Sequence, residues 1–484
     1  MNIKSSLHII GNFLKYLGLL MLVPIVCSLI YREDDIWVFV VSAAITSVFG
    51  FTLEILTRTT DKTYEFQRKD GFLIASLCWI TAAHFGAIPY LLYGVLTNPI
   101  DAVFETIAGF TTTGATVIKD VEILPHGILF WRNLTQWLGG MGIIVLGIAV
   151  LPRLAVGGMQ LMALETPGPT KEKIAPRIVE TAKKLWGVYI VFTLLLILLL
   201  VLAGMPIYDS IIHSFTTLST GGFSSKNLSI AAYNNPIIEL IITLFMFLAG
   251  ANFVLHYGLF RGEVKKFYRN PEFRFYFFVT ILAISLISLQ LWAEDYHSFL
   301  KSLRFSSFQV LSISTTTGYA TTNFDLWPSF SKWLLFLLMF VGGCAGSTAG
   351  AIKNIRIMVL FKKGYREVYK LIYPKAVIPI RVGDTPVGED VVSSIATFFL
   401  LYIFIFLMAS LLIMGIENED IITAISACAA TFGNVGPGLG KVGPVEQYGY
   451  LSNFTKVILS LLMLIGRLEL FTILVLFTPA YWKS

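Results

Sequence analysis

Long apolar stretches alternate with short polar stretches along most of the chain. Runs such as Trp186–Leu202 and Phe398–Met414 contain no charged residue. A helix needs roughly 20 mostly apolar residues to cross about 30 Å of hydrocarbon, and the pattern predicts about ten such spans. The first two are predicted at Leu14–Ile30 and Ile36–Leu56.

After Arg68, one arrangement recurs four times: a span, a stretch too short to cross a bilayer, a polar turn, and a second span. The predicted first spans are Gly71–Leu96, Leu185–Met205, Phe273–Trp292 and Val391–Met414. The short stretches are Asp101–Phe110, Tyr208–Leu218, Ser298–Ser314 and Glu419–Thr431. The second spans are His126–Leu151, Pro236–Phe260, Pro328–Leu360 and Leu451–Pro479. The pattern therefore predicts a two-helix domain at residues 1–68 and four repeats at residues 69–180, 181–272, 273–385 and 386–484.

Each short stretch is predicted to be a re-entrant half-helix that enters and leaves the membrane on the same side. Ten helical residues span about 15 Å, which is half of the hydrocarbon thickness. The polar turn that follows cannot face lipid, because its backbone groups would lose their hydrogen bonds, so it should line protein or water. Acidic residues begin three of these stretches, at Asp101, Asp209 and Glu419–Asp420, where they suit helix N-caps and the positive helix end.

The four polar turns share a threonine–glycine sequence. FTTTGATV begins at Phe110, LSTGGFSS at Leu218, STTTGYAT at Ser314, and a weaker copy, ATFGNVGP, at Ala430. We align Gly114, Gly221, Gly318 and Gly433, which lie roughly one hundred residues apart. That period is too long for a solenoid, and it suits a four-fold pseudo-symmetric membrane domain.

Such turns can bind a dehydrated cation, because backbone carbonyls supply several oxygens at once without adding charge. Glycine turns consecutive carbonyls to one side at little cost, although it is also common in ordinary loop ends. The candidate filter residues are Thr112, Thr113, Gly114, Thr220, Gly221, Thr316, Thr317, Gly318, Gly433 and Asn434. The fourth turn departs from the others, because Phe432 and not threonine precedes its aligned glycine.

A second candidate element interrupts the third repeat at Phe340–Lys353, with the sequence FVGGCAGSTAGAIK. Its glycines make poor helix, so we interpret it as a movable gate, although small residues also serve close helix packing. The candidate gate residues are Gly342, Gly343, Gly346, Ser347, Thr348, Gly350 and Arg467. Arg467 lies inside the last span, where arginine is costly unless it faces water or a partner. Glu469 is too close along the helix to be that partner, so Arg467 should point inward.

Composition and charge agree with an all-α polytopic membrane protein. Hydrophobic residues make up 56% and charged residues 14% of the 484 residues, against about 25% charged residues in soluble domains. Basic residues gather at 58–69, 153–184, 261–274 and 353–381, which predicts that these loops and both termini are cytoplasmic. No basic–aromatic surface suggests nucleic acid, and no HExxH or GxSxG motif suggests an enzyme or a cofactor on this chain.

The residues resemble the Trk/Ktr/HKT superfamily of potassium transport proteins, and within it the TrkH/TrkG branch. The motifs are FTTTGAT, TGGFS, TTTGYATT, GNVGPGLG, GGCAGSTAG and GRLELF. The resemblance implies four M1–pore helix–M2 repeats and a potassium uptake pore, with potassium held at the filter residues above. It also implies a homodimer in the bacterial inner membrane, surrounded by lipid, and a cytoplasmic TrkA-like regulatory subunit that binds NAD or ATP. Gly342–Gly350 would match the family's gating loop and Arg467 its pore-facing arginine.

Two other functions stay open at this point. A secondary transporter of a small solute usually has two inverted halves, each with one broken helix, whereas this chain shows four parallel repeats. A sodium-coupled cation symporter would use the same repeats, and the residues do not distinguish passive from coupled flux.

Overall fold

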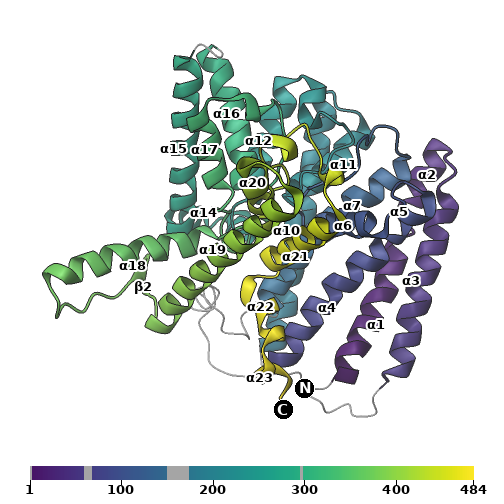
Figure 1. Cartoon of the computed structure of the whole chain (residues 1–484), viewed down its shortest axis with the longest axis horizontal. Coiled ribbons are helices and arrows are strands. Elements are labelled where there is room, and N and C mark those ends of the chain that lie inside the picture. The colour runs from purple at the N-terminus through teal and green to yellow at the C-terminus, as the bar shows by residue number, and fades with distance from the viewer. Residues whose placement is uncertain (1–2, 59–67, 150–173, 295–297, 484) are drawn as a thin grey trace.

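A computed structural model describes residues 3–58, 68–149, 174–294 and 298–483. Helices dominate this part of the chain, and its only strands, β1 (Arg381–Val382) and β2 (Thr385–Pro386), form one small antiparallel hairpin. Both termini lie at the same end of the molecule, and α18 with its hairpin projects sideways from the body (Figure 1).

The N-terminal unit consists of α1 (Ile3–Leu20), α2 (Ile25–Tyr31) and α3 (Ile36–Leu56). Its first helix begins well before the predicted Leu14, because the polar residues near the terminus lower the hydropathy without ending the helix. Small residues let α1 and α3 approach closely: a Cβ placed on Gly11 would lie 2.8 Å from the carbonyl oxygen of Gly50. Close backbone approach of this kind is typical of helix packing in membranes.

The four repeats follow the predicted order. The first helices are α4 (Arg68–Gly86) continued by α5 (Ile88–Tyr93), α10 (Ile174–Leu202), α15 (Pro271–Ala293) and α19 (Glu389–Glu417). The half-length helices, called pore helices below, are α6 (Pro99–Phe110), α11 (Ile207–Leu218), α16 (Phe299–Ser314) and α20 (Ile421–Phe432). The second helices are α7 (His126–Ala149), α12 (Pro236–Ala249) with α13 (Phe253–Phe260), α17 (Ser329–Leu338) with α18 (Asn354–Ile372), and α21 (Asn453–Arg467) with α22 (Leu470–Leu474).

Short elements complete the described chain. They are α14 (Val264–Arg269), α23 (Pro479–Trp482) and the 3-10 helices η2 (Ser229–Tyr233), η3 (Phe324–Leu326), η4 (Gly440–Val442), η5 (Tyr448–Tyr450) and η6 (Val475–Phe477). The predicted end of the first repeat's second span, Leu151, lies outside the described residues.

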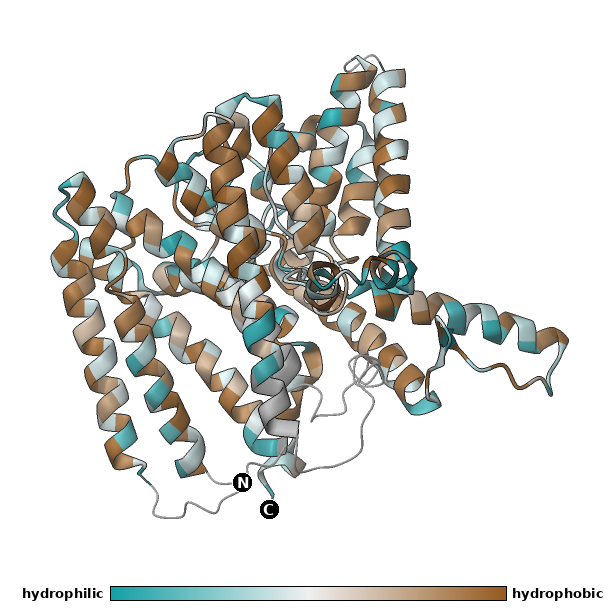
Figure 2. Ribbon diagram, turned by 180° about the vertical axis from the view of Figure 1, so that it is seen from behind, coloured by the Kyte–Doolittle hydropathy of each residue, from teal (hydrophilic) through white to brown (hydrophobic). Residues whose placement is uncertain are grey.

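The membrane-spanning helices agree with the predicted fold class. Among the described residues, six helices are long and apolar enough to cross a membrane, or up to eight if each of two bent pairs is one span. The helix α7 and the pair α17–α18 occupy the two remaining predicted positions. Apolar residues cover much of the helices (Figure 2), and large side chains such as Leu194 and Leu400 are exposed. Extended exposed apolar surface of this kind fits a lipid-facing boundary.

Two predicted second spans are wrong as continuous helices. Pro236–Phe260 bends by 102° and Leu451–Pro479 by 115° at short breaks. At the first bend, Asn252 caps the new helix by accepting a hydrogen bond from Val254 N at 2.8 Å. At the second, Glu469 has a φ of 63°, which does not continue a helix. Hydropathy averaged over a span does not detect either break, because the flanking residues are apolar.

The acidic residues at the pore-helix starts have different roles from one another. Asp420 is the N-cap of α20 and accepts a hydrogen bond from Thr423 N at 3.1 Å, as predicted. Asp101 lies in the first turn of α6 and pairs with Lys456 at 2.7 Å. Asp209 also lies in a first turn, in α11, and accepts a hydrogen bond from Ser225. The capping prediction is therefore correct for Asp420 alone.

Candidate functional site

The loops that leave the four pore helices share one backbone conformation. The second residue after each helix is left-handed, with φ of 54° at Thr112, 55° at Thr220, 59° at Thr316 and 55° at Asn434. A left-handed glycine follows two residues later, with φ of 79° at Gly114, 77° at Gly222, 80° at Gly318 and 104° at Gly436. Left-handed threonine is strained, so its occurrence at matching positions in three loops points to a shared geometric requirement.

These conformations correct the sequence alignment in two loops. The glycines equivalent to Gly114 and Gly318 are Gly222 and Gly436, not Gly221 and Gly433. The alignment had matched the first glycine in each turn, whereas the structure places the left-handed glycine four residues after the last residue of every pore helix. Gly222, Gly436 and Val435, which directly precedes Gly436, are therefore absent from the predicted filter residues. Counting from the helix ends would have found them.

The four loops meet in a closed ring. An added side chain on Gly114 would collide with the carbonyl oxygen of Gly221, and one on Gly222 with that of Thr317. A Cβ added to Gly318 would collide with the carbonyl oxygen of Val435. A Cβ added to Gly436 would lie 2.6 Å from the carbonyl oxygen of Thr113, which belongs to the first loop. Equivalent carbonyls of consecutive loops therefore adjoin in the order one, two, three, four, one, and the chain closes the ring by itself.

In three of the four loops, side chains of the loop residues themselves stabilise the loop. The hydroxyls of Thr111 and Thr113 lie 2.7 Å apart, and those of Thr315 and Thr317 lie 2.8 Å apart. In the fourth loop, the Asn434 amide donates to Thr113 Oγ1 and to the carbonyl oxygen of Met463, both at 2.9 Å. Asn434 therefore joins the fourth loop to the first.

The candidate gate is the loop Phe340–Lys353 between α17 and α18, which is called the gate hairpin below. It lies against the ring. It closes on itself through Gly342 N, which donates to the carbonyl oxygen of Ile352 at 2.9 Å. Gly350 N donates to Thr316 Oγ1 at 2.7 Å, and Thr348 Oγ1 donates to the carbonyl oxygen of Leu218 at 2.9 Å. The hairpin thus contacts the second pore helix and the third loop directly.

Small residues in this hairpin are required by close backbone approach. A side chain added to Gly342 would collide with the Gly350 carbonyl, and one added to Gly343 would lie 2.5 Å from the carbonyl oxygen of Gly250. Gly346 has a φ of 74°, and the Ser347 hydroxyl donates to the carbonyl oxygen of Cys344 at 2.6 Å. The segment both interrupts the helix and packs closely against its neighbours. Its small residues therefore fit the interpretation as a gate and the interpretation as a close packing site.

Arg467 ends α21 and is buried, with 2% of its surface exposed. Its guanidinium donates to the carbonyl oxygen of Thr348 at 2.7 Å and to that of Gly139 at 3.3 Å. Glu469 pairs instead with Arg356 at 2.5 Å. Arg467 therefore points inward without pairing with Glu469, as the sequence analysis expected, and it bonds the gate hairpin.

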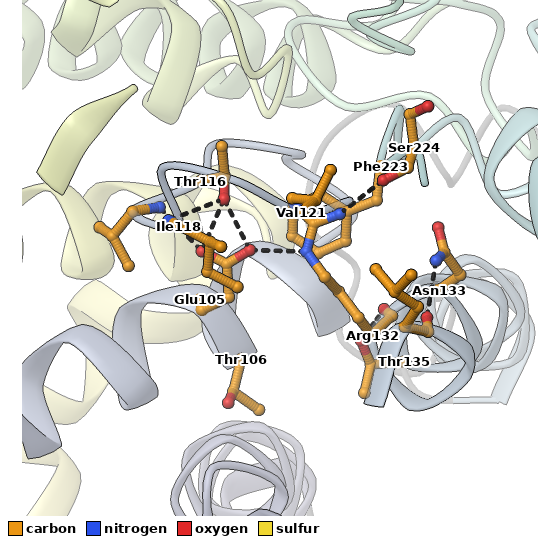
Figure 3. A network of polar contacts seen from close by, with 12 residues as sticks. Glu105, Thr106, Thr116, Ile118, Val121, Arg132, Asn133, Thr135, Phe223 and Ser224 are labelled. Carbon is orange, nitrogen blue, oxygen red and sulfur yellow. Dashed lines mark hydrogen bonds and ion pairs between the residues drawn. The ribbon is translucent and has the colours of Figure 1, made fainter. Parts of the chain in front are cut away.

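A buried ion pair behind the ring was missed by the sequence analysis. Glu105 of α6 and Arg132 of α7 are joined at 2.8 Å (Figure 3), and both side chains are almost completely buried. Glu105 also accepts hydrogen bonds from Thr116 Oγ1 at 2.9 Å and Val117 N at 2.8 Å. A charged residue inside an apolar half-helix is a signal in its own right, and it could have identified Glu105.

Carboxylate, imidazole and thiol groups do not gather into a metal site in the described part of the chain. The converging groups at the ring are backbone carbonyls, which favour a dehydrated monovalent cation over a tightly ligated metal.

Known proteins match the whole length of the chain. The sequence profile of the TrkH family, described as a cation transport protein, matches residues 37–484. The chain is 42% identical to the Trk system potassium uptake protein TrkH of Halomonas elongata and 40% identical to that of Escherichia coli, with 100% of each chain covered. The crystal structure of the potassium transporter TrkH from Vibrio parahaemolyticus superposes with a TM-score of 0.91 at 37% identity, again over 100% of both chains. The protein described here is therefore a member of the TrkH family of cation transport proteins.

Proposed function

We propose that the chain takes up potassium ions through the ring formed by its four loops. The observation that carries this proposal is the cyclic approach of equivalent carbonyls from Thr113, Gly221, Thr317 and Val435. Carbonyl rings of this type replace the hydration shell of potassium. The relatives reported above are named as potassium uptake proteins, which supports potassium as the ion.

The gate hairpin and Arg467 are proposed to control this flux. The hairpin bonds Thr316 in one of the four loops, and Arg467 bonds the hairpin at Thr348. A cation leaving the ring on this side would meet both a packed backbone and a positive charge. Movement of the hairpin would have to break the bond from Arg467, which therefore acts as a latch.

The proposed setting is the bacterial inner membrane, with cytoplasmic termini, a homodimer and a TrkA-like regulatory subunit that binds NAD or ATP. The basic clusters supply the orientation. The arm formed by α18 projects from the body (Figure 1) and exposes Phe361, Tyr365 and Leu371, which suits a protein contact. The relatives' names refer to a Trk system, which fits a transporter that works with other components.

Rubidium uptake into liposomes tests the proposed function. Purified protein should carry rubidium down its gradient, and external potassium should compete with it much better than equal sodium. Absence of rubidium flux from well-folded protein would overturn the proposal. Flux that requires a sodium gradient would instead favour sodium-coupled symport.

A further inference from the structure

The second loop lacks the internal brace that holds the first and third. Those loops use a hydroxyl pair, Thr111 with Thr113 and Thr315 with Thr317. The residue of the second loop equivalent to Thr113 is Gly221, which has no side chain, and another glycine follows it. Two consecutive glycines have wide conformational freedom, so this loop needs support from outside.

Gln136 of α7 supplies that support. Its side chain is completely buried, and Nε2 donates to the carbonyl oxygen of Gly221 at 2.7 Å. Its Oε1 accepts from Phe223 N at 3.0 Å. A side chain added to Gly221 would collide with the Gln136 amide. Gln136 therefore occupies the space that the missing side chain leaves, and it bonds the backbone on both sides of Gly222.

Arg132, which lies one helical turn before Gln136 on α7, contacts the same loop. Residues four apart share a helix face, so Arg132 and Gln136 both reach the second loop. The guanidinium carbon of Arg132 lies 3.5 Å from the centre of the Phe223 ring, and Nη1 donates to the carbonyl oxygen of Ser224 at 3.2 Å. Glu105 fixes the guanidinium from the opposite side (Figure 3). The first repeat thus grips the loop of the second.

We propose that Gln136 and Arg132 are positioning residues that fix the second loop of the ring and thereby set the preference for potassium over sodium. This proposal rests on the proposed function. A carbonyl oxygen has two lone pairs, so Gly221 O can accept from Gln136 and still face a cation. Gln136 and Arg132 together are called the bracket below. Without the bracket, the glycine pair can relax toward the shorter oxygen distances that a sodium ion takes, and the preference for potassium falls.

The decisive variant is Gln136→Leu, measured by competition of potassium and sodium with rubidium flux in liposomes. Loss of two hydrogen bonds should lower the potassium preference by roughly three- to tenfold. The matched control is Gln290→Leu on α15. Gln290 also makes two side-chain bonds, with Ser331 at 2.6 Å and Glu294 at 3.0 Å, and its loss should leave the ratio unchanged.

A compensating variant separates positioning from general stability. Gln136→Ala combined with Gly221→Thr removes the glutamine and offers Ser219 a hydroxyl partner like those in the first and third loops. The φ of Gly221 is outside the left-handed region, so threonine can be accommodated. The pair should recover most of the lost preference relative to Gln136→Ala alone.

The ion pair is tested without leaving a buried charge unpaired. Glu105→Gln with Arg132→Met should lower the preference as Gln136→Leu does. Glu239→Gln with Arg304→Met removes another ion pair, joined at 2.9 Å between α12 and α16, in which the Arg304 side chain is 32% exposed. Arg304 lies eleven residues and about 16 Å of helix before Thr315. This control should keep the wild-type ratio.

The flux measurements distinguish failure of the proposed function from failure of the bracket. Wild-type protein without rubidium flux would contradict the proposed function itself. A wild-type protein that prefers potassium, with the same preference in Gln136→Leu and in Glu105→Gln/Arg132→Met, would overturn the bracket alone. If Gln136→Leu does not fold, a compensating pair whose potassium preference does not exceed that of Gln136→Ala would overturn it equally.

Discussion

Single residues define the ring, and Gly318 shows how little freedom one position has. Its φ of 80° is in the left-handed region, and an added Cβ would collide with the carbonyl oxygen of Val435 in the next loop. Left-handed conformation costs a non-glycine residue roughly 1–2 kcal/mol, to which the collision adds. Gly318→Ala or Gly318→Ser should therefore lower the potassium-to-sodium preference about tenfold or more in rubidium competition assays.

The control for this prediction is Gly415→Ala on α19. A Cβ at Gly415 would meet no atom within 4 Å, so its flux and ion preference should match the wild type. Unchanged preference in both Gly318 variants would count against a filter at this loop.

Arg467 gives a second prediction at the residue scale. Arg467→Ala removes the bond to the Thr348 carbonyl, and hydrogen bonds to charged groups contribute about 1.5–3 kcal/mol. The closed position of the gate hairpin should weaken by that amount, which raises basal rubidium flux by roughly tenfold or more. Arg467→Lys should fall between. Equal or lower flux from folded Arg467→Ala protein would reject the latch.

The sequence predicted which four loops come together, but not which residues in them occupy equivalent positions. Threonine–glycine sequences located all four loops, because each loop contains a left-handed position that glycine adopts at little cost. The sequence could not show which of Gly221 and Gly222 takes that conformation, since either fits. It also could not show that Asn434 takes the place of threonine, because that depends on contacts with Thr113 and Met463 from distant segments.

At the scale of elements, the pore helices were predictable and the breaks in the second helices were not. The predicted Asp101–Phe110 agrees closely with α6, because a short apolar stretch between polar turns has few alternatives. Both bends have tertiary contacts with the gate hairpin. Near Asn252, Phe253 N donates to the Gly346 carbonyl at 3.1 Å, and near Glu469 the Arg467 guanidinium donates to the Thr348 carbonyl at 2.7 Å. Such contacts join segments that are far apart in the sequence, so the hydropathy of the local segment does not predict them.

The N-cap of α20 provides a prediction at this scale. Asp420→Ala removes the bond to Thr423 N and should cost about 1 kcal/mol of stability, whereas Asp420→Asn should retain most of it. Thermal unfolding in detergent would measure both. An alanine variant as stable as the wild type at neutral pH would show that the cap contributes nothing.

The same cap should be sensitive to acid. Hydrogen bonds from the side chain and backbone of Thr423 hold the pKa of the Asp420 carboxyl below its ordinary value of 3.8. A carboxyl with a lowered folded-state pKa stabilises the protein above the unfolded-state pKa, and this contribution is lost as the pH falls through the folded-state value. The stability difference between wild type and Asp420→Asn should therefore shrink as the pH falls below about 4.

At the scale of the whole molecule, one chain supplies all four quarters of the ring. Co-reconstitution of wild type with Gly318→Ser should therefore reduce selective potassium flux in proportion to the wild-type fraction, even within a dimer. A ring built from four separate chains would retain only about one sixteenth of the flux at equal mixing. A steeper than linear fall would mean that chains share a pore.

The ring's construction from four unequal copies also bears on how such a protein can evolve. In an assembly of identical subunits, one codon change alters every quadrant at once, and a damaging change is multiplied. Here the second loop has glycine at a position where Gln136 fills the space, and the fourth has Asn434 where the other three have threonine. Each quadrant can drift and be repaired by its neighbour alone, so ion preference can be adjusted in small, separately inherited steps.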